Sequence, residues 1–163
     1  MKKKIFILLA IFLMVFVTGC SLTDENPATN PSQKPVVNKA FEFDDLEITV
    51  SDNVSFVKLN NQFSDHNGKD VIKIPVTIKN IDDDENNSLN MFYYTAFNAS
   101  GTEADNVSTY FMNEDASDYA GELRPGAEYT KYLYFIYEGD GKYIIEFDAI
   151  FGDKKELEIN ITK

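Results

Sequence analysis

The sequence predicts an all-β fold, an antiparallel β-sandwich that occupies residues 41–163. Three observations predict this class. Several short segments alternate apolar and polar residues, Gly, Pro and Asn residues separate these segments, and no long stretch has the apolar spacing of an amphipathic helix. The hydrophobic fraction of 44% and the aromatic fraction of 13% are sufficient for a core. We therefore expect one folded domain.

The first strands are predicted at residues 46–50 and 72–78, where every second residue is apolar. Another strand begins near Val54, and its apolar phase shifts after Phe56, which indicates a bulge. Pro75 lies on the polar side of residues 72–78 and has no N–H to donate. We therefore expect that strand at a sheet edge or with a bulge at the proline.

Two later segments, residues 91–98 and 129–137, have aromatic residues on both faces, as is typical of central strands. Tyr93 and Tyr94 point to opposite faces, and Tyr132 and Tyr134 share one face of their strand. Exposed tyrosines would favour contact with a protein or glycan. The alternative is that other parts of the sandwich cover them.

The C-terminal region predicts a three-stranded meander over residues 129–162, because turn residues near 139–141 and 152–153 separate three apolar runs. Counting all segments gives seven or eight short strands. The architecture predicted from this count is an immunoglobulin-like antiparallel β-sandwich of 7–8 strands. A small barrel is the alternative.

Residues 1–19 predict a signal peptide that precedes the domain. Lysines at positions 2–4 are followed by thirteen apolar residues, 5–17, a run too short to span a membrane as a helix. Cys20 comes directly after this segment and is the only cysteine, so the chain has no internal disulfide and no site built from several cysteines.

Residues 17–20, Val-Thr-Gly-Cys, resemble the bacterial lipobox. This resemblance implies cleavage between Gly19 and Cys20 and attachment of diacylglyceryl and palmitate chains to Cys20. We therefore expect a lipoprotein anchored to the outer, extracytoplasmic face of the cell membrane. Residues 20–40 carry three prolines among Asn, Ser and Thr, which predicts a disordered linker between the lipidated cysteine and the domain.

The charge of the chain excludes one class of partner. The full sequence has a net charge of −12, and removal of the three signal lysines leaves 12 Lys and Arg against 27 Asp and Glu, a net charge of −15. Affinity for nucleic acids depends on Lys and Arg that displace counterions from phosphates. We therefore expect no nucleic-acid partner.

Three segments carry a resemblance to a known family. They are residues 76–80, which end in Asn80, the aromatic residues 92–101 that lead to a Gly turn, and Leu123-Arg124-Pro125-Gly126. The chain resembles an immunoglobulin-like domain family of uncharacterised function, found on lipoproteins of Gram-positive bacteria and related to a secreted mycobacterial immunogenic antigen. The same pattern resembles a bacterial proteinase-inhibitor domain, whose expected tryptophan this sequence lacks.

Two acidic loops offer the hard oxygen ligands that calcium prefers, although neither has EF-hand spacing. Solvated loops are the alternative. His66 is the only histidine and no Gly-x-Ser-x-Gly segment accompanies it, so we expect no catalytic residues and no cofactor. The candidate calcium ligands are Asp65, Asn67, Asp70, Asp82, Asp83 and Asp84.

The sequence thus favours a non-catalytic binding module displayed on the cell surface. Its expected partners are the membrane, through the lipid anchor, and a protein or a cell-wall component. A proteinase-inhibitor-like domain and a calcium-dependent adhesion domain are the alternatives, and an enzyme is not expected.

Overall fold

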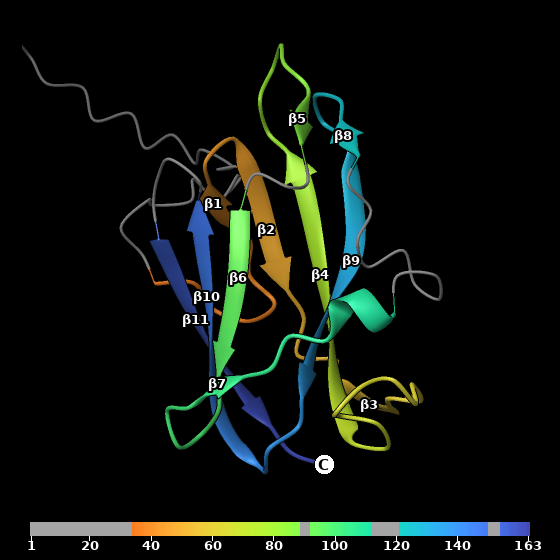
Figure 1. Ribbon diagram of the computed structural model, residues 1–163. Coiled ribbons are helices and arrows are strands. Elements are labelled where there is room, and N and C mark those ends of the chain that lie inside the picture. Colours follow the sequence, from red (N-terminus) through yellow and green to blue (C-terminus); the bar gives the residue numbers. More distant parts are fainter. Residues whose placement is uncertain (1–33, 89–91, 112–120, 150–153) are drawn as a thin grey trace, which may run out of the picture.

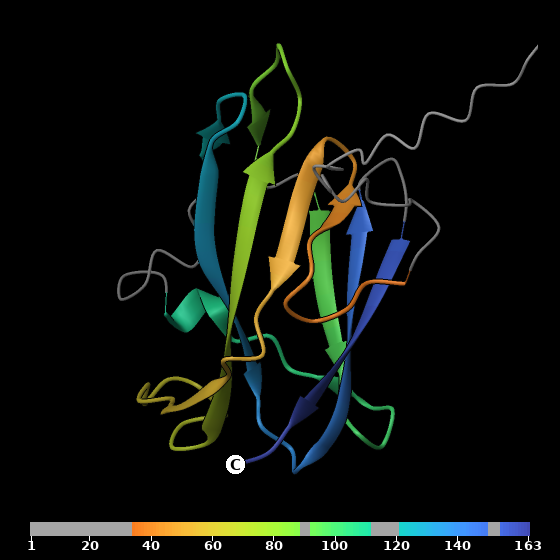
Figure 2. The same ribbon diagram turned by 180° about the vertical axis from the view of Figure 1, so that it is seen from behind.

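A computed structural model describes residues 34–88, 92–111, 121–149 and 154–163 (Figure 1). These residues form eleven strands and one short 3-10 helix, η1. The strands lie in two facing layers, one with β2, β4 and β9 and the other with β6, β10 and β11 (Figures 1 and 2). The predicted all-β sandwich is therefore confirmed.

The element bounds are β1 Phe41–Phe43, β2 Leu46–Val50, β3 Ser55–Lys58, β4 Asp70–Asn80, β5 Asn87–Ser88, β6 Phe92–Phe97, β7 Glu103–Ala104, η1 Ser108–Tyr110, β8 Glu122–Leu123, β9 Glu128–Ile136, β10 Gly141–Ala149 and β11 Lys154–Ile161. Eight of these strands have three or more residues. The other three, β5, β7 and β8, have two residues each, too few to show an alternating pattern in the sequence.

Strand β4 is the centre of the first sheet. Strands β2 and β3 pair with successive parts of one of its edges, and β9 pairs with the other edge over nearly its whole length. Strand β1 extends this sheet beyond β2. The second sheet has the order β11-β10-β6-β7, and β5 pairs with β8 as a separate ribbon at one end (Figure 1). All of these pairs are antiparallel.

The main core lies between the two sheets and follows the alternation seen in the sequence. Inward residues of β2, β4 and β9 meet inward residues of β10 and β11, while the intervening residues face outward. The ring of Phe147 packs edge-on against Phe41, with 5.6 Å between the ring centres. The buried residues of this core include Phe43, Leu46, Ile48, Ile72, Ile74, Val76, Ile78, Leu133, Phe135, Tyr143, Ile145, Phe147, Leu157, Ile159 and Ile161.

The predicted meander is wrong, because β9 and β10 belong to different sheets. Strand β9 pairs with β4, whereas β10 pairs with β11 and β6. The chain crosses between the layers at residues 137–140. A side chain at Gly141 would meet Ala99 at 2.6 Å between the two Cβ atoms, so glycine is required at this crossing.

The crossing is held by Tyr143, near the start of β10. Its buried hydroxyl accepts the backbone N–H of Glu138 and donates to the carbonyl of Gly139, both at 3.1 Å. A tyrosine that hydrogen-bonds back to the chain a few residues upstream, where the chain changes sheets, is typical of immunoglobulin-like sandwiches. Burial raises the pKa of this phenol.

Pro75 does not lie in an edge strand, and no bulge interrupts the β4–β9 register around it. Its carbonyl accepts the N–H of Ser51 at 2.9 Å. The backbone nitrogen and carbonyl of Pro75 therefore point toward β2 and β3 and not toward β9. The β2 ladder stops at Val76 and the β3 ladder at Lys73. Pro75 thus occupies the gap between two partner strands, where its missing N–H breaks no bond to β9.

The structure describes residues 34–40 of the segment predicted as a linker. Val36 forms an isolated parallel bridge with Glu158 of β11, and Pro35 is buried. The N–H of Asn38 donates to the carbonyl of Val50 at 2.8 Å. These residues therefore lie against both sheets of the domain.

One end of the sandwich is organised around the fully buried side chain of Asn80. Its amide nitrogen donates to the carbonyls of Glu85 and Leu123, at 2.8 and 2.9 Å. Its amide oxygen accepts the N–H of Asp82 and the side-chain amide of Asn87. All four hydrogen-bonding positions of the amide are therefore used.

The backbone of Asn80 adds two further bonds. Its N–H donates to the carbonyl of Ala127, and its carbonyl accepts the N–H of Gly126. Gly126 has a φ of 74°, a conformation that glycine adopts without strain. The two sequence features of the family resemblance, the Asn-ended strand and the Leu-Arg-Pro-Gly turn, therefore meet in space.

Replacing Asn80 with Asp tests this arrangement. Asn80→Asp removes both donors and places a carboxylate against two buried carbonyls, so we expect a loss of about 2–4 kcal/mol in the free energy of unfolding, measured by urea denaturation with circular dichroism. The control is Asn53→Asp, the same change at an exposed loop residue, which should stay within about 0.5 kcal/mol of the unchanged protein. Equal stabilities of the two variants would contradict the role of Asn80.

Candidate functional site

The outward surface of the β11-β10-β6-β7 sheet is the candidate site. Every second residue of β10 is buried between the sheets, so the residues between them face outward, and the register places β6 and β11 residues beside them. We call this surface the β10 face. It consists of Tyr93, Thr95 and Phe97 of β6, Glu103 of β7, Lys142, Ile144, Glu146 and Asp148 of β10, and Lys154, Glu156, Glu158 and Asn160 of β11.

The centre of the β10 face is apolar. Phe97 and Ile144 lie directly opposite each other on neighbouring strands, and both are half-buried. Tyr93 lies on the same face of β6 and is 69% exposed, while Tyr94 packs against the core. The two side chains therefore point to opposite faces, as the sequence predicted. An exposed tyrosine and a half-buried apolar pair on one face of a sheet form a surface that a partner can cover.

Carboxylates flank the apolar centre. Glu146 lies directly opposite Glu156, and Asp148 lies opposite both Tyr93 and Lys154. Lys154 Nζ lies 2.6 Å from the Glu146 carboxylate, and this hydrogen bond raises the pKa of the lysine. The β10 face is therefore apolar in the middle and acidic around it.

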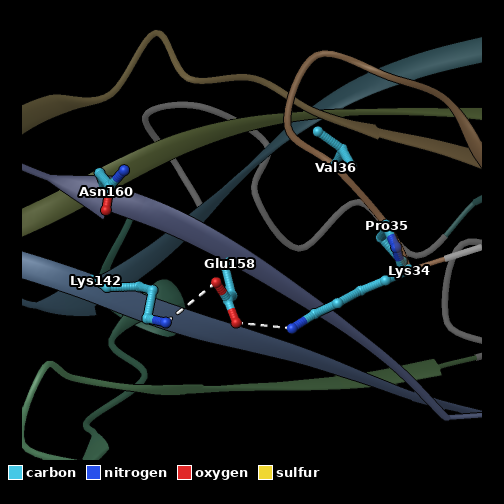
Figure 3. A pocket seen from close by; sticks show the side chains of 6 residues that line it. All are labelled: Lys34, Pro35, Val36, Lys142, Glu158 and Asn160. Atoms are coloured by element: carbon cyan, nitrogen blue, oxygen red, sulfur yellow. Dashed lines mark hydrogen bonds and ion pairs between the residues drawn. The ribbon is translucent and has the colours of Figure 1, made fainter.

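A shallow pocket of about 300 Å³ adjoins the β10 face at the edge of β11 (Figure 3). Glu158 lies between two lysines there, with Lys34 Nζ at 2.7 Å and Lys142 Nζ at 3.2 Å from its two oxygens. The hydrogen bonds from Lys34 and Lys142 lower the pKa of Glu158, and the bond to Glu158 raises that of Lys34. The pocket is lined by Lys34, Pro35, Val36, Lys142, Glu158 and Asn160.

The outward surface of the other sheet is partly covered. A second apolar cluster packs on β4 and β9 beneath η1 and the loop after β3, so Tyr134 is fully buried. The ring of Phe111 stacks on Tyr134, with 4.4 Å between the ring centres. Tyr132 is half-buried, and Lys73 Nζ lies 4.1 Å from the centre of its ring. Of the tyrosines considered in the sequence, Tyr93 is the one that is exposed.

The first group of candidate calcium ligands is held in separate interactions. The side-chain oxygen of Asn67 accepts the N–H of Asn61, which shapes the loop after β3. Asp70 binds the ammonium groups of Lys163 and Lys58, which lower the pKa of its carboxyl. Asp65 is exposed on the same loop.

The second group forms a turn. Asp82 accepts the N–H groups of Asp84 and Glu85 at 2.7 and 2.8 Å, and these bonds lower the pKa of its carboxyl. Asp83 and Asp84 are exposed. Within the residues that the structure describes, no three His, Cys, Asp or Glu side chains come together as a metal site.

His66 lies on the loop after β3 and is half-buried. Its Nε2 is 3.4 Å from the carboxylate of Asp105, and the ammonium of Lys69 is 3.2 Å from its Nδ1. The histidine therefore connects this loop to the segment between β7 and η1. No serine or cysteine nucleophile is among the described partners of its ring.

Cys20 and the predicted cleavage position after Gly19 lie outside the described residues. Within the described ranges, no helix is both long and apolar enough to cross a membrane.

Comparison with known proteins identifies the family of the chain. The model of a domain of unknown function, DUF4352, matches residues 35–157. The chain belongs to the DUF4352 family. The match includes Asn80, the turn at residues 124–126 and nearly all of the β10 face. No curated protein matches the chain in a search of sequences.

Several solved structures share the fold of this DUF4352 domain. The yjhA protein of Bacillus subtilis aligns with a TM-score of 0.58 at 16% identity, over 76% of this chain and 97% of that chain. The ycdA protein of Bacillus subtilis, described as a putative lipoprotein, gives 0.51 at 19% identity, over 75% of this chain and 38% of that one. An uncharacterised β-sandwich protein of Clostridium difficile gives 0.50 at 16%, over 83% and 99%.

Proposed function

We propose that this DUF4352 protein is a lipoprotein of a Gram-positive cell surface, anchored through Cys20, and that its sandwich is a non-catalytic binding module. The order of lysines, apolar run and Val-Thr-Gly-Cys supports the anchor. The likeness to ycdA, itself described as a putative lipoprotein, is in keeping with it. The relation to a secreted mycobacterial antigen stays a prediction based on the Asn80 and Leu-Arg-Pro-Gly features.

The binding surface that we assign to this module is the β10 face. One observation carries the assignment: this face has an exposed aromatic side chain, Tyr93, on the same side of the sheet as the half-buried Phe97 and Ile144, whereas η1 and the loop after β3 cover part of the opposite sheet. Tyr93 and Phe97 are four residues apart on β6, about 13 Å along the strand. A rigid sheet presents such side chains with little loss of conformational entropy on binding. The lipid anchor would place this face outside the cell.

The anchor is tested by intact-mass measurement of the protein from the membrane fraction. We expect a chain that begins at Cys20 and carries diacylglyceryl, because two acyl chains, at about 0.8 kcal/mol per buried methylene, give stable attachment. The Cys20→Ser variant should carry no lipid and leave the membrane fraction. An unmodified chain that retains residues 1–19 would contradict the proposal.

The binding surface is tested by photo-cross-linking on intact cells. A benzophenone amino acid at position 93 should form adducts with a partner, because Tyr93 lies on the proposed surface. The control is the same substitution at Phe63, which is 88% exposed on the loop after β3 and lies outside the β10 face. Adducts from position 63 alone, or from neither position, would contradict the β10 face as the binding surface.

A further inference from the structure

The charge of the β10 face determines which partner it fits. The face carries five carboxylates, Glu103, Glu146, Asp148, Glu156 and Glu158, against two lysines, Lys142 and Lys154. Lys154 pairs with Glu146, and Lys142 pairs with Glu158. Among the described residues, Glu103, Asp148 and Glu156 make no ion pair. The charge that remains around the apolar centre is therefore negative.

One arrangement on this face is unfavourable in the isolated protein. Glu146 and Glu156 lie directly opposite each other on β10 and β11, and like charges in this position destabilise a sheet. Lys154 compensates Glu146. Glu156 is exposed, and its charge contributes to raising the pKa values of Lys34 and Lys154, but these lysines form their ion pairs with Glu158 and Glu146. A cation supplied by a partner would remove this repulsion.

The same charges exclude other occupants of the face. A second copy of the chain would bring acidic side chains against acidic side chains in a two-fold contact, since such an interface uses the same surface twice. An anionic lipid or nucleic acid would be repelled. Complementary potentials favour a basic partner that also has apolar side chains for the centre.

We propose that the β10 face binds a basic polypeptide segment. Its Lys or Arg side chains would lie on Glu156, Asp148 and Glu103. Its apolar side chains would cover Phe97 and Ile144 and, further along β6, Tyr93. This inference rests on the proposed use of the β10 face for binding, and adds the chemical class of the partner.

The test uses the full chain in neutral detergent and a fluorescent peptide of alternating lysine and valine, with binding followed by anisotropy. Binding should weaken as salt is added, because exposed charge pairs are screened. Glu156→Lys should weaken it about tenfold. This variant places a lysine opposite Glu146 and removes the repulsion between the two carboxylates, so lost binding would not reflect lost folding.

The matched control is Glu47→Lys, which changes the net charge by the same amount on the other sheet, where Glu47 lies opposite Lys79. Peptide binding to this variant should equal that of the unchanged chain. Equal weakening by the two variants would show non-specific attraction to an acidic protein and overturn the proposal. A lysine–serine peptide that binds as tightly as the lysine–valine peptide would overturn the role of the apolar centre.

The two proposals fail in different ways. If position 93 cross-links on cells to a partner without a basic segment, and the lysine–valine peptide does not bind, the β10 face remains the binding surface and the basic partner is wrong. If position 93 forms no adduct and the peptide does not bind, both proposals are wrong. A dimer held through the β10 face, detected by sedimentation, would identify a second copy as the occupant and overturn the basic partner.

Discussion

The buried amide of Asn80 is the interaction on which one end of the sandwich depends. It connects the end of β4 to the loop at residues 81–87, to β8 and, through its backbone, to the turn before β9. Strand β4 in turn pairs with β2, β3 and β9. Asn80 thus connects the loop that follows β4 to residues 123–127, and its side chain has a strong requirement for this arrangement, because a buried amide that lost these partners would remain unsatisfied.

The outer surfaces of the two sheets differ in how far they are covered. One sheet carries a second apolar cluster on its outer side, where Phe111 and Leu59 cover Tyr134 and Val71. The other sheet ends in the β10–β11 hairpin and leaves its outward residues exposed, Tyr93 among them. The acidic chain places carboxylates on this open side. A sheet surface, an apolar centre and an excess of negative charge occur there together.

The sequence predicts those parts of the fold that depend on local alternation. Residues 46–50, 72–78 and 157–161 lie in strands with the expected faces inward, because burial of every second residue is a property of the strand itself. The partner of β9 could not be predicted in this way, since alternation is the same in either sheet. The sheet edge or bulge predicted from Pro75 is wrong, because the gap between β2 and β3 that accommodates the proline depends on where both strands pair with β4.

The candidate site was partly predictable for the same reason. The opposite directions of Tyr93 and Tyr94 follow from strand geometry, but the burial of Tyr134 depends on Phe111, more than twenty residues away in the sequence. The sequence shows directly that the two loops are rich in acidic residues. It does not predict the partners of these residues, because Asp70 pairs with Lys163, far away in the sequence, and Asp82 accepts backbone N–H groups. The charge of the β10 face required the register of β10 against β11.

Carboxyl footprinting, applied to the purified protein and to the protein on its own cells, tests the central claim most directly. The account predicts that Glu103, Asp148 and Glu156 are labelled in the purified protein and protected on cells, whereas Glu47 and Glu128, on the outer side of the other sheet, are labelled equally in both. Equal labelling of all five carboxylates, or protection confined to Glu47 and Glu128, would contradict the β10 face as the binding surface.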